Sequence, residues 1–308
     1  MRHIVLVGFL QAQNCTTIPA AWRHPEARHD VTSAGYYRHL GRVLEAGLFD
    51  LGFFDDRLAM PDMYGGDHRH TVENGIRCVK LDPTTVLTVM GMATERLGLG
   101  ATYSTTYHAP FHVARVFATL DHLTEGRAAW NVVTSVNDNE ARNMGVERAP
   151  AHDERYDLAD EFMEVVHGHW DAWDEDAIVA DRSTGLYAYG DRVHRLDHEG
   201  PHYRSRGPFT VPRTPQGHPV VIQAGQSGRG VDFAARWGEL VFTSQTNLER
   251  AVASTAVTRQ AVADIGRDPA GVKLANLTFP MIGRTLSEAE DKRAAYDELP
   301  NMIDDLSL

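Results

Sequence analysis

The chain has 308 residues, 43% of them hydrophobic, and its formal net charge is −12. This length suits one α/β barrel, so we expect a single domain over residues 1–308. The acidic balance argues against nucleic acid or an anionic membrane as a partner, and two cysteines, Cys15 and Cys78, are too few for a disulfide framework or a cysteine-rich metal site.

The first segment with a clear pattern is the apolar run from Ile4 to Leu10. It is too short to span a membrane, and no small-residue cleavage site follows it. It therefore predicts a buried strand. We expect a cytoplasmic protein with reduced thiols.

Strand-like and helix-like segments alternate along most of the chain. Strands are predicted over residues 3–10, 50–56, 97–110, 127–133, 219–225, 239–245 and 272–283. Helical spacing predicts helices over 36–50, 83–98, 111–126, 152–170 and 230–238, and another from 287. This alternation predicts a parallel sheet, either a barrel or a doubly wound sheet. Seven predicted strands leave an eight-stranded barrel one short.

Residues 174–212 have no periodicity. An irregular stretch of this length within a compact domain is typical of a functional insertion or lid. We expect the substrate to lie beneath it and beneath the loop over residues 11–25.

Five predicted strands end in hydrogen-bonding groups. The residues at these ends are Asp55 and Asp56; Thr102, Ser104 and Thr105; Asn131, Thr134 and Ser135; Gln223, Gly225 and Ser227; and Thr243, Ser244 and Gln245. A polar loop or a helix cap explains any one of them. Ligands meet the C-terminal ends of parallel strands, so the five together favour a common pocket.

A glycine-rich turn follows the fifth predicted strand, in the segment QAGQSGRG from Gln223 to Gly230. Glycines permit close backbone approach, and free amides at a helix start suit a phosphate. The order G-x-x-G-x-G differs from the dinucleotide fingerprint G-x-G-x-x-G. A generic strand–helix turn is the alternative.

Aromatic side chains lie in or beside the strand ends: Phe9, Phe53, Phe54, Tyr103, Tyr107, Trp130 and Phe242. Core packing is the default role of each, but some could wall a flat ring. A flat ring, a polyol chain and one phosphate together describe flavin mononucleotide (FMN).

A metal site is not expected, although the chain has 16 histidines. The close pairs His68/His70 and His167/His169 lack the i, i+4 spacing of helical ligands, and no H-E-x-x-H motif occurs. Asp55 and Asp56 could serve in acid–base chemistry, but adjacent strand residues point to opposite faces, so at most one faces a pocket.

Several longer segments carry a family resemblance. They are DLGFFDD, LGLGATYSTTYHAPFHVARVFATLDHLTEGRAAWNVVTS, HDERYDLADEFMEVV and GPFTVPRTPQGHPVVIQAGQSGRGVDFAARWGELVFT. They resemble the bacterial-luciferase-like superfamily, and within it the branch of nitrilotriacetate monooxygenase and dibenzothiophene-sulfone monooxygenase.

The resemblance implies a (β/α)8 TIM barrel that binds FMNH2 delivered by a separate NAD(P)H:flavin reductase. With O2 the reduced flavin would form a (hydro)peroxide that oxygenates a small organic substrate, so the cofactor carries the hard chemistry. We expect a homodimer or homotetramer. Family members usually run on to an eighth strand and helix, and we expect that unit to be missing from this sequence.

By position in these motifs, the resemblance also implies cofactor-binding residues. Asp55 would lie near the isoalloxazine edge, Thr102 near the ring and Asn131 beneath it. His152 and Tyr156 would approach the ribityl chain and phosphate. The phosphate turn would comprise Ala224, Gly225 and Ser227.

No catalytic acid or base stands out. His24, His108 and Asn14 are candidates for proton management, and Cys15 could line the pocket. Three alternatives stay open: a deazaflavin F420-dependent oxidoreductase of the same superfamily, a flavin-degrading lyase of the same branch, and a non-catalytic flavin-binding barrel.

Overall fold

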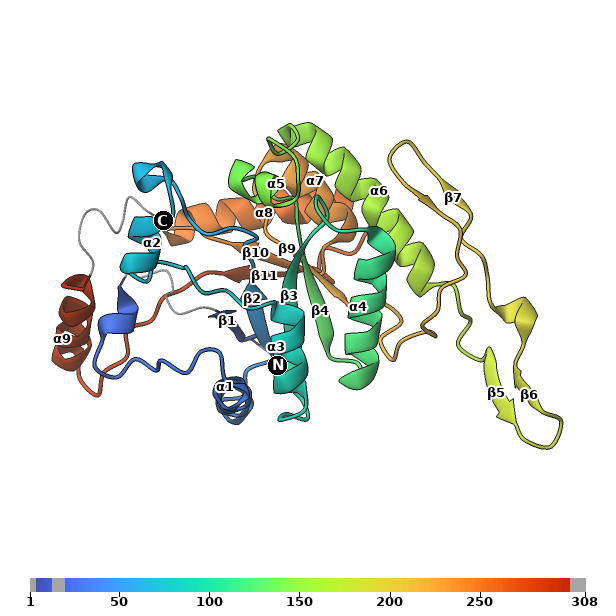
Figure 1. Ribbon diagram of the computed structural model, residues 1–308, viewed down its shortest axis with the longest axis horizontal. Coiled ribbons are helices and arrows are strands. Elements are labelled where there is room, and N and C mark those ends of the chain that lie inside the picture. The colour runs from blue at the N-terminus through green and yellow to red at the C-terminus, as the bar shows by residue number, and fades with distance from the viewer. Residues whose placement is uncertain (1–3, 13–19, 300–308) are drawn as a thin grey trace.

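The computed structural model describes residues 4–12 and 20–299. Its centre is a parallel seven-stranded sheet in the order β1-β2-β3-β4-β9-β10-β11 (Figure 1). The strands are β1 (Val7–Gln11), β2 (Leu51–Asp55), β3 (Gly98–Ser104), β4 (Ala128–Val133), β9 (Val220–Gln223), β10 (Leu240–Thr243) and β11 (Lys273–Asn276). All seven strands predicted from the sequence are confirmed: six are shorter than predicted, and β1 begins later and ends one residue later, at Gln11.

The sheet curls around an apolar interior. Phe9 of β1 lies 5.7 Å, between ring centroids, from Phe242 of β10, although five strands separate the two edges of the sheet in its order. Phe53 of β2 contacts both rings. Among the described residues no strand pairs the free edge of β1 with that of β11.

Helices α1 (Ala34–Ala46), α3 (Pro83–Gly91), α4 (Pro110–Leu123), α6 (His152–Trp170), α7 (Gly228–Trp237) and α8 (Leu248–Asp264) surround the sheet. The short helices α2 (Arg69–Glu73) and α5 (Asp138–Asn143) lie in loops between them, and α9 (Leu286–Asp297) stands apart from the sheet and has no buried residue (Figure 1). In the described part of the chain, none of them combines the length and apolarity that a membrane crossing needs.

The sequence pattern missed α8. Only Thr258 and Val262 of this helix are buried, so its apolar residues do not mark one face. The helical spacing of the predicted 36–50 helix also placed Leu40, Val43, Leu44 and Leu48 on one apolar face, but Val43 is exposed. Leu48 lies beyond the end of α1, where its backbone is left-handed (φ 59°) and its side chain is exposed.

The main core lies between β2–β4 and the helices α3, α4 and α6. Trp130 of β4 is fully buried there, with its ring stacked on Phe117 of α4 and in edge contact with Trp170 of α6. Its indole N–H donates to the Tyr103 carbonyl at 3.0 Å, so the one polar group of this side chain is satisfied.

The irregular 174–212 segment forms two small hairpins, β5 (Ile178–Asp181) with β6 (Leu186–Ala188) and β7 (His198–Glu199) with β8 (Arg204–Ser205). Glu161 of α6 holds the second hairpin, accepting hydrogen bonds from the amides of His202 and Tyr203. The segment leaves the C-terminal end of α6 and projects away from the sheet (Figure 1). In this structure it therefore does not cover the polar strand ends, where we expected a lid.

Candidate active site

Polar side chains form one tier inside the curled sheet, above the apolar floor. This polar layer consists of Gln11, Asp55, Thr102 and Asn131. Strand register sets the tier, because Gln11 pairs with Asp55 and Thr102 pairs with Asn131. The floor beneath contains Phe9, Leu51, Phe53, Ala129 and Ile222 among others. Three of the residues implied by the resemblance thus lie together at the C-terminal strand ends.

Hydrogen bonds connect the polar layer but leave one acceptor open. The Asn131 amide donates to Thr102 Oγ1 at 2.8 Å, and that hydroxyl donates to the Phe54 carbonyl at 2.9 Å. Asn131 Oδ1 is buried and has no hydrogen-bond partner among the described residues. A buried unpaired acceptor is costly, so this oxygen is suited to a ligand donor.

The two aspartates at the end of β2 have different surroundings, as alternation predicts. Asp55 accepts from Gln11 Nε2 at 2.9 Å and from Lys80 Nζ at 2.5 Å, which fixes its carboxylate in the polar layer. Burial raises the pKa of Asp56 to about 6, although the nearby Lys80 opposes that shift.

A second cluster surrounds the turn between β9 and α7, which we call the phosphate turn (residues 224–228). Ser227 caps α7, its hydroxyl accepting from the Gly230 amide at 3.1 Å. His152 at the start of α6 approaches that hydroxyl, with Nε2 3.2 Å from Ser227 Oγ. Two helix N-termini therefore converge here, and both favour an anion.

Tyr156 packs closely against this turn. A Cβ at Gly225 would lie 2.7 Å from the Tyr156 hydroxyl, and one at Gly230 would lie 2.8 Å from it, so both positions need glycine. The close packing explains why the sequence places glycines there, and it brings α6 against the start of α7. His152, Tyr156, Ala224, Gly225 and Ser227 are thus brought together as expected.

Hydrogen bonding constrains the His152 ring. Nδ1 lies 2.7 Å from Asp153 Oδ1, and a carboxylate can only accept, so the proton belongs on Nδ1. The neutral ring then accepts at Nε2 from the Ser227 hydroxyl.

The two clusters lie on neighbouring strands. Asn131 of β4 is in register with Ile222 of β9, and Ala224 follows two residues later. A ligand with a ring at the polar layer and an anionic end at the phosphate turn would therefore extend along one rim of the sheet.

The candidates for proton management lie in different parts of the structure. His108 stacks on Tyr103 beside the end of β3, with Nδ1 2.9 Å from the Ser104 carbonyl oxygen. His24 stacks on Tyr296 of α9 instead. Asn14 and Cys15 lie outside the described residues.

Sequence reasoning missed Gln11 and Lys80. Gln11 was detectable, because it directly follows the first predicted strand (3–10) and alternation places it on the same face as Phe9. Lys80 has no such signal, since it reaches Asp55 from the segment between α2 and α3.

Comparisons with known proteins agree with this architecture. The model of the luciferase-like monooxygenase family matches residues 22–306. Dibenzothiophene-sulfone monooxygenase of Rhodococcus erythropolis is 47% identical over 292 residues, covering 94% of this chain and 64% of the relative. The chain thus spans less than two thirds of the length of that relative.

Two solved structures are also similar. A long-chain alkane monooxygenase superposes with a TM-score of 0.96 at 33% identity, over all of this chain and 71% of the other. A riboflavin lyase, solved with modified FMN and riboflavin, superposes with a TM-score of 0.93 at 34% identity, over 97% of this chain and 67% of the other. On this evidence, the chain belongs to the luciferase-like monooxygenase family.

Proposed function

We propose that this chain is the oxygenating component of a two-component monooxygenase that takes FMNH2 from an NAD(P)H:flavin reductase and uses O2 to oxygenate a small organic substrate. The observation that carries the proposal is the pairing of the polar layer with the phosphate turn on the neighbouring strands β4 and β9. Family membership supports the proposal, because the family is one of monooxygenases and this chain is 47% identical to dibenzothiophene-sulfone monooxygenase over 292 residues.

The residues present fit FMN. At the phosphate turn, the first-turn amides of α7 and the Ser227 hydroxyl are donors for a phosphate, and His152 lies beside that hydroxyl. At the polar layer, the orphan Asn131 Oδ1 could accept from a ring N–H. Asp55 is held in place by two donors, so it can orient a ring without moving.

The protein would contribute binding, orientation and exclusion of water. Bound FMNH2 would supply the activation of O2, which no side chain here can perform. Ser227 and His152 would hold the phosphate, and Thr102 and Asn131 would set the position of the ring. The apolar floor beneath the polar layer would keep water from one side of the pocket.

Flavin affinity tests the cofactor assignment. Tyr156→Phe combined with Ser227→Ala should weaken FMN binding by about tenfold or more, because a phosphate would lose a donor and its packed support. Ser33→Ala is the matched control, since it also removes a serine N-cap, at α1, away from this cluster. Unchanged FMN affinity in a fluorescence titration of the double variant would reject the phosphate turn.

Oxygen uptake tests the reaction. The chain should consume O2 in the presence of FMN, NADH and a generic flavin reductase when a suitable compound is included from a panel of sulfur compounds, alkanes and polyamino-carboxylates. An F420-dependent enzyme would show no such uptake. A non-catalytic barrel would bind FMN but turn over no compound in the panel.

A flavin-degrading lyase is the second candidate, because a riboflavin lyase is among the similar structures. The fate of the flavin separates the two. A monooxygenase leaves the flavin intact over many turnovers, whereas a lyase consumes it in proportion to the oxygen taken up. Chromatography of the flavin after the assay decides between them.

We also propose that the complete architecture is an eight-stranded barrel. The edges of β1 and β11 line one hollow of about 670 Å³ together with Phe49, Phe53 and Phe242. A further parallel strand in this hollow would pair both edges and remove the exposed backbone groups.

A further inference from the structure

Lys80 brings a positive charge to the polar layer. Its ammonium Nζ lies 2.5 Å from Asp55 Oδ1, and the two side chains are only 14% and 29% exposed. In the part of the chain that the structure describes, no other basic side chain forms an ion pair with Asp55. Because a partly buried pair is screened much less than a surface pair, this charge acts on whatever occupies the site.

The backbone around Lys80 is anchored. The amide of Leu81 donates to the carbonyl of buried Ala12 at 2.8 Å, which joins this segment to the residue after β1. Asp82 then caps α3, accepting from the amide of Thr84 at 2.9 Å. The ammonium therefore reaches Asp55 from a segment that is already ordered, so forming the ion pair costs little backbone entropy.

The two donors of Asp55 differ in charge. Gln11 is neutral and donates from Nε2 to Asp55 Oδ2 at 2.9 Å, whereas Lys80 donates to Oδ1 and is charged. Each carboxylate oxygen has one donor from the protein and keeps acceptor capacity for a ligand N–H. Both donors fix the orientation of the carboxylate, but only Lys80 compensates its negative charge.

Further carboxylates lie around Lys80. Burial raises the pKa of the neighbouring Asp56 to about 6, and the positive charge of Lys80 opposes that shift. The negative charges of Asp82 and Asp55 act on the same Asp56 carboxyl. Lys80 thus offsets an acidic region, and without its ammonium the polar layer would face uncompensated negative charge.

A flavin ring at the polar layer would respond to this charge. Reduction makes the ring more electron-rich, and the reduced ring readily loses a proton to become an anion. A bare carboxylate at the ring edge would repel that form more than the neutral oxidised ring. Charges placed beside the ring are one means by which a protein tunes a bound flavin, and an ammonium paired with the carboxylate removes the repulsion.

We propose that Lys80 is a positioning residue that acts through Asp55 and makes the site favour reduced over oxidised FMN. It holds the carboxylate in place and keeps the polar layer close to neutral, so that the electron-rich ring is accepted. The inference rests on the proposed use of FMNH2. It suits a component that must capture reduced flavin and release oxidised flavin after each turnover.

The reduction potential of bound FMN tests the role of Lys80. Lys80→Met should weaken the binding of reduced FMN about tenfold more than that of oxidised FMN. This difference lowers the potential of the bound flavin by about 30 mV, the equivalent of tenfold for a two-electron couple. Lys80→Gln keeps a donor for Asp55 without the charge and should give the same shift, whereas Lys80→Arg should keep the parental potential.

Gln11→Met is the matched control, because it also removes one donor to Asp55 but no charge. It should weaken both states of FMN alike and leave the potential unchanged. Asp55→Asn combined with Lys80→Met removes both charges, so its potential should return toward that of the unaltered chain. Circular dichroism shows that each variant is folded.

The outcomes separate this inference from the proposed function. An unchanged potential in both Lys80→Met and Lys80→Gln, or an equal shift in Gln11→Met, would overturn the role of Lys80 while FMN binding stands. If the unaltered chain binds FMN in neither state, the proposed function fails and the inference fails with it.

Discussion

The two sides of the curled sheet differ in how they are supported. The early wall, β2–β4 with α3, α4 and α6, contains the largest fully buried side chains, among them Trp130, Trp170 and Phe162. The late edge, β10 and β11 with α8 and α9, buries little: α9 has no buried residue and α8 has two. Asp55, Thr102 and Asn131 all lie on the early wall, so the candidate ring site is placed on the better-packed half of the protein.

The largest effect should come from removing the central ring of the early wall. Trp130→Ala should cost about 4 kcal/mol of unfolding free energy, because it leaves a cavity and removes the stacking on Phe117. Leu286→Ala, on exposed α9, should change stability by less than about 0.5 kcal/mol. Urea unfolding of both variants measures the contrast, and equal losses would show that the two sides are supported alike.

Two arginines brace backbone carbonyls on the two sides. Arg127 donates to the carbonyls of Gly91, Thr94, Leu97 and Thr124, and Arg267 does the same for Ala235, Arg236 and Gly238. Arg127→Met should lower the free energy of unfolding by about 3 kcal/mol, because it leaves four backbone carbonyls at the base of the early wall without a donor.

Arg267→Met should cost less, about 1 kcal/mol, since water can reach part of that site. Thermal unfolding followed by circular dichroism compares the two variants. If Arg267→Met lowers the stability more than Arg127→Met does, the late edge and not the early wall is the better supported side.

The pH dependence of stability should also differ between the early wall and the late edge. Because the native pKa of Asp56 is raised to about 6 by burial, folded protein keeps this proton where unfolded chain loses it near 3.8. Asp56 therefore makes the protein less stable as pH rises from about 4 to about 6. Asp56→Asn should be more stable than the parent at pH 8, by about 1–2 kcal/mol after allowance for partial exposure, and should lose this advantage at pH 4.

Glu239 is the counterpart at the late edge. Partial burial of its carboxyl also raises its pKa, against a backbone hydrogen bond at Val221 and the charge of Arg267, but the residue as a whole remains accessible to water. Glu239→Gln should therefore change the pH profile less than Asp56→Asn does. Unfolding midpoints measured across this pH range test both variants, and identical profiles would contradict the expected difference.

The smallest effects should come from helix caps. Ser33 accepts from the Tyr36 amide at the start of α1, and Thr285 accepts from the Glu288 amide at the start of α9. Ser33→Ala should lower global stability by about 1 kcal/mol, since α1 packs on the sheet. Thr285→Ala should only speed local amide exchange within α9. Hydrogen exchange resolved by mass spectrometry distinguishes global from local loss, and a global loss from both would refute the contrast.

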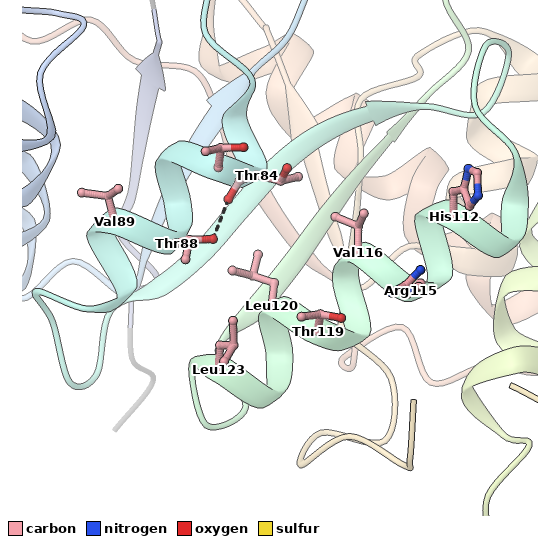
Figure 2. A pocket seen from close by; sticks show the side chains of 10 residues that line it. Thr84, Thr88, Val89, His112, Arg115, Val116, Thr119, Leu120 and Leu123 are labelled. Carbon is pink, nitrogen blue, oxygen red and sulfur yellow. Dashed lines mark hydrogen bonds between the residues drawn. The ribbon is translucent and has the colours of Figure 1, made fainter. Parts of the chain in front are cut away.

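Sequence reasoning was strongest where one pattern determines one structure. Buried strands of this sheet are apolar runs with polar ends, so all seven were predicted, and alternation placed Asp55 and Asp56 in different surroundings. The pattern failed where packing is one-sided or weak. Leu123 has the helical spacing of the buried residues of α4 but is exposed and lines a groove on the outer surface, between α3 and α4 (Figure 2). In α8 the apolar residues do not gather on one face at all.

The candidate site was predictable to a similar degree. Motif resemblance indicated the phosphate turn, and the structure brings its residues together. The Lys80–Asp55 contact could not be predicted, because the two residues are 25 positions apart and join through a loop. The direction of the 174–212 segment was also hidden, since it depends on tertiary contacts such as those of Glu161 with the amides of His202 and Tyr203.

Aromatic rings meet across the open side of the curled sheet, where Phe9 of β1 and Phe53 of β2 both contact Phe242 of β10. Ring faces can slide over one another without breaking a backbone ladder. Substitutions at these rings would therefore reshape the apolar floor of the barrel without breaking the backbone pairing of the early wall.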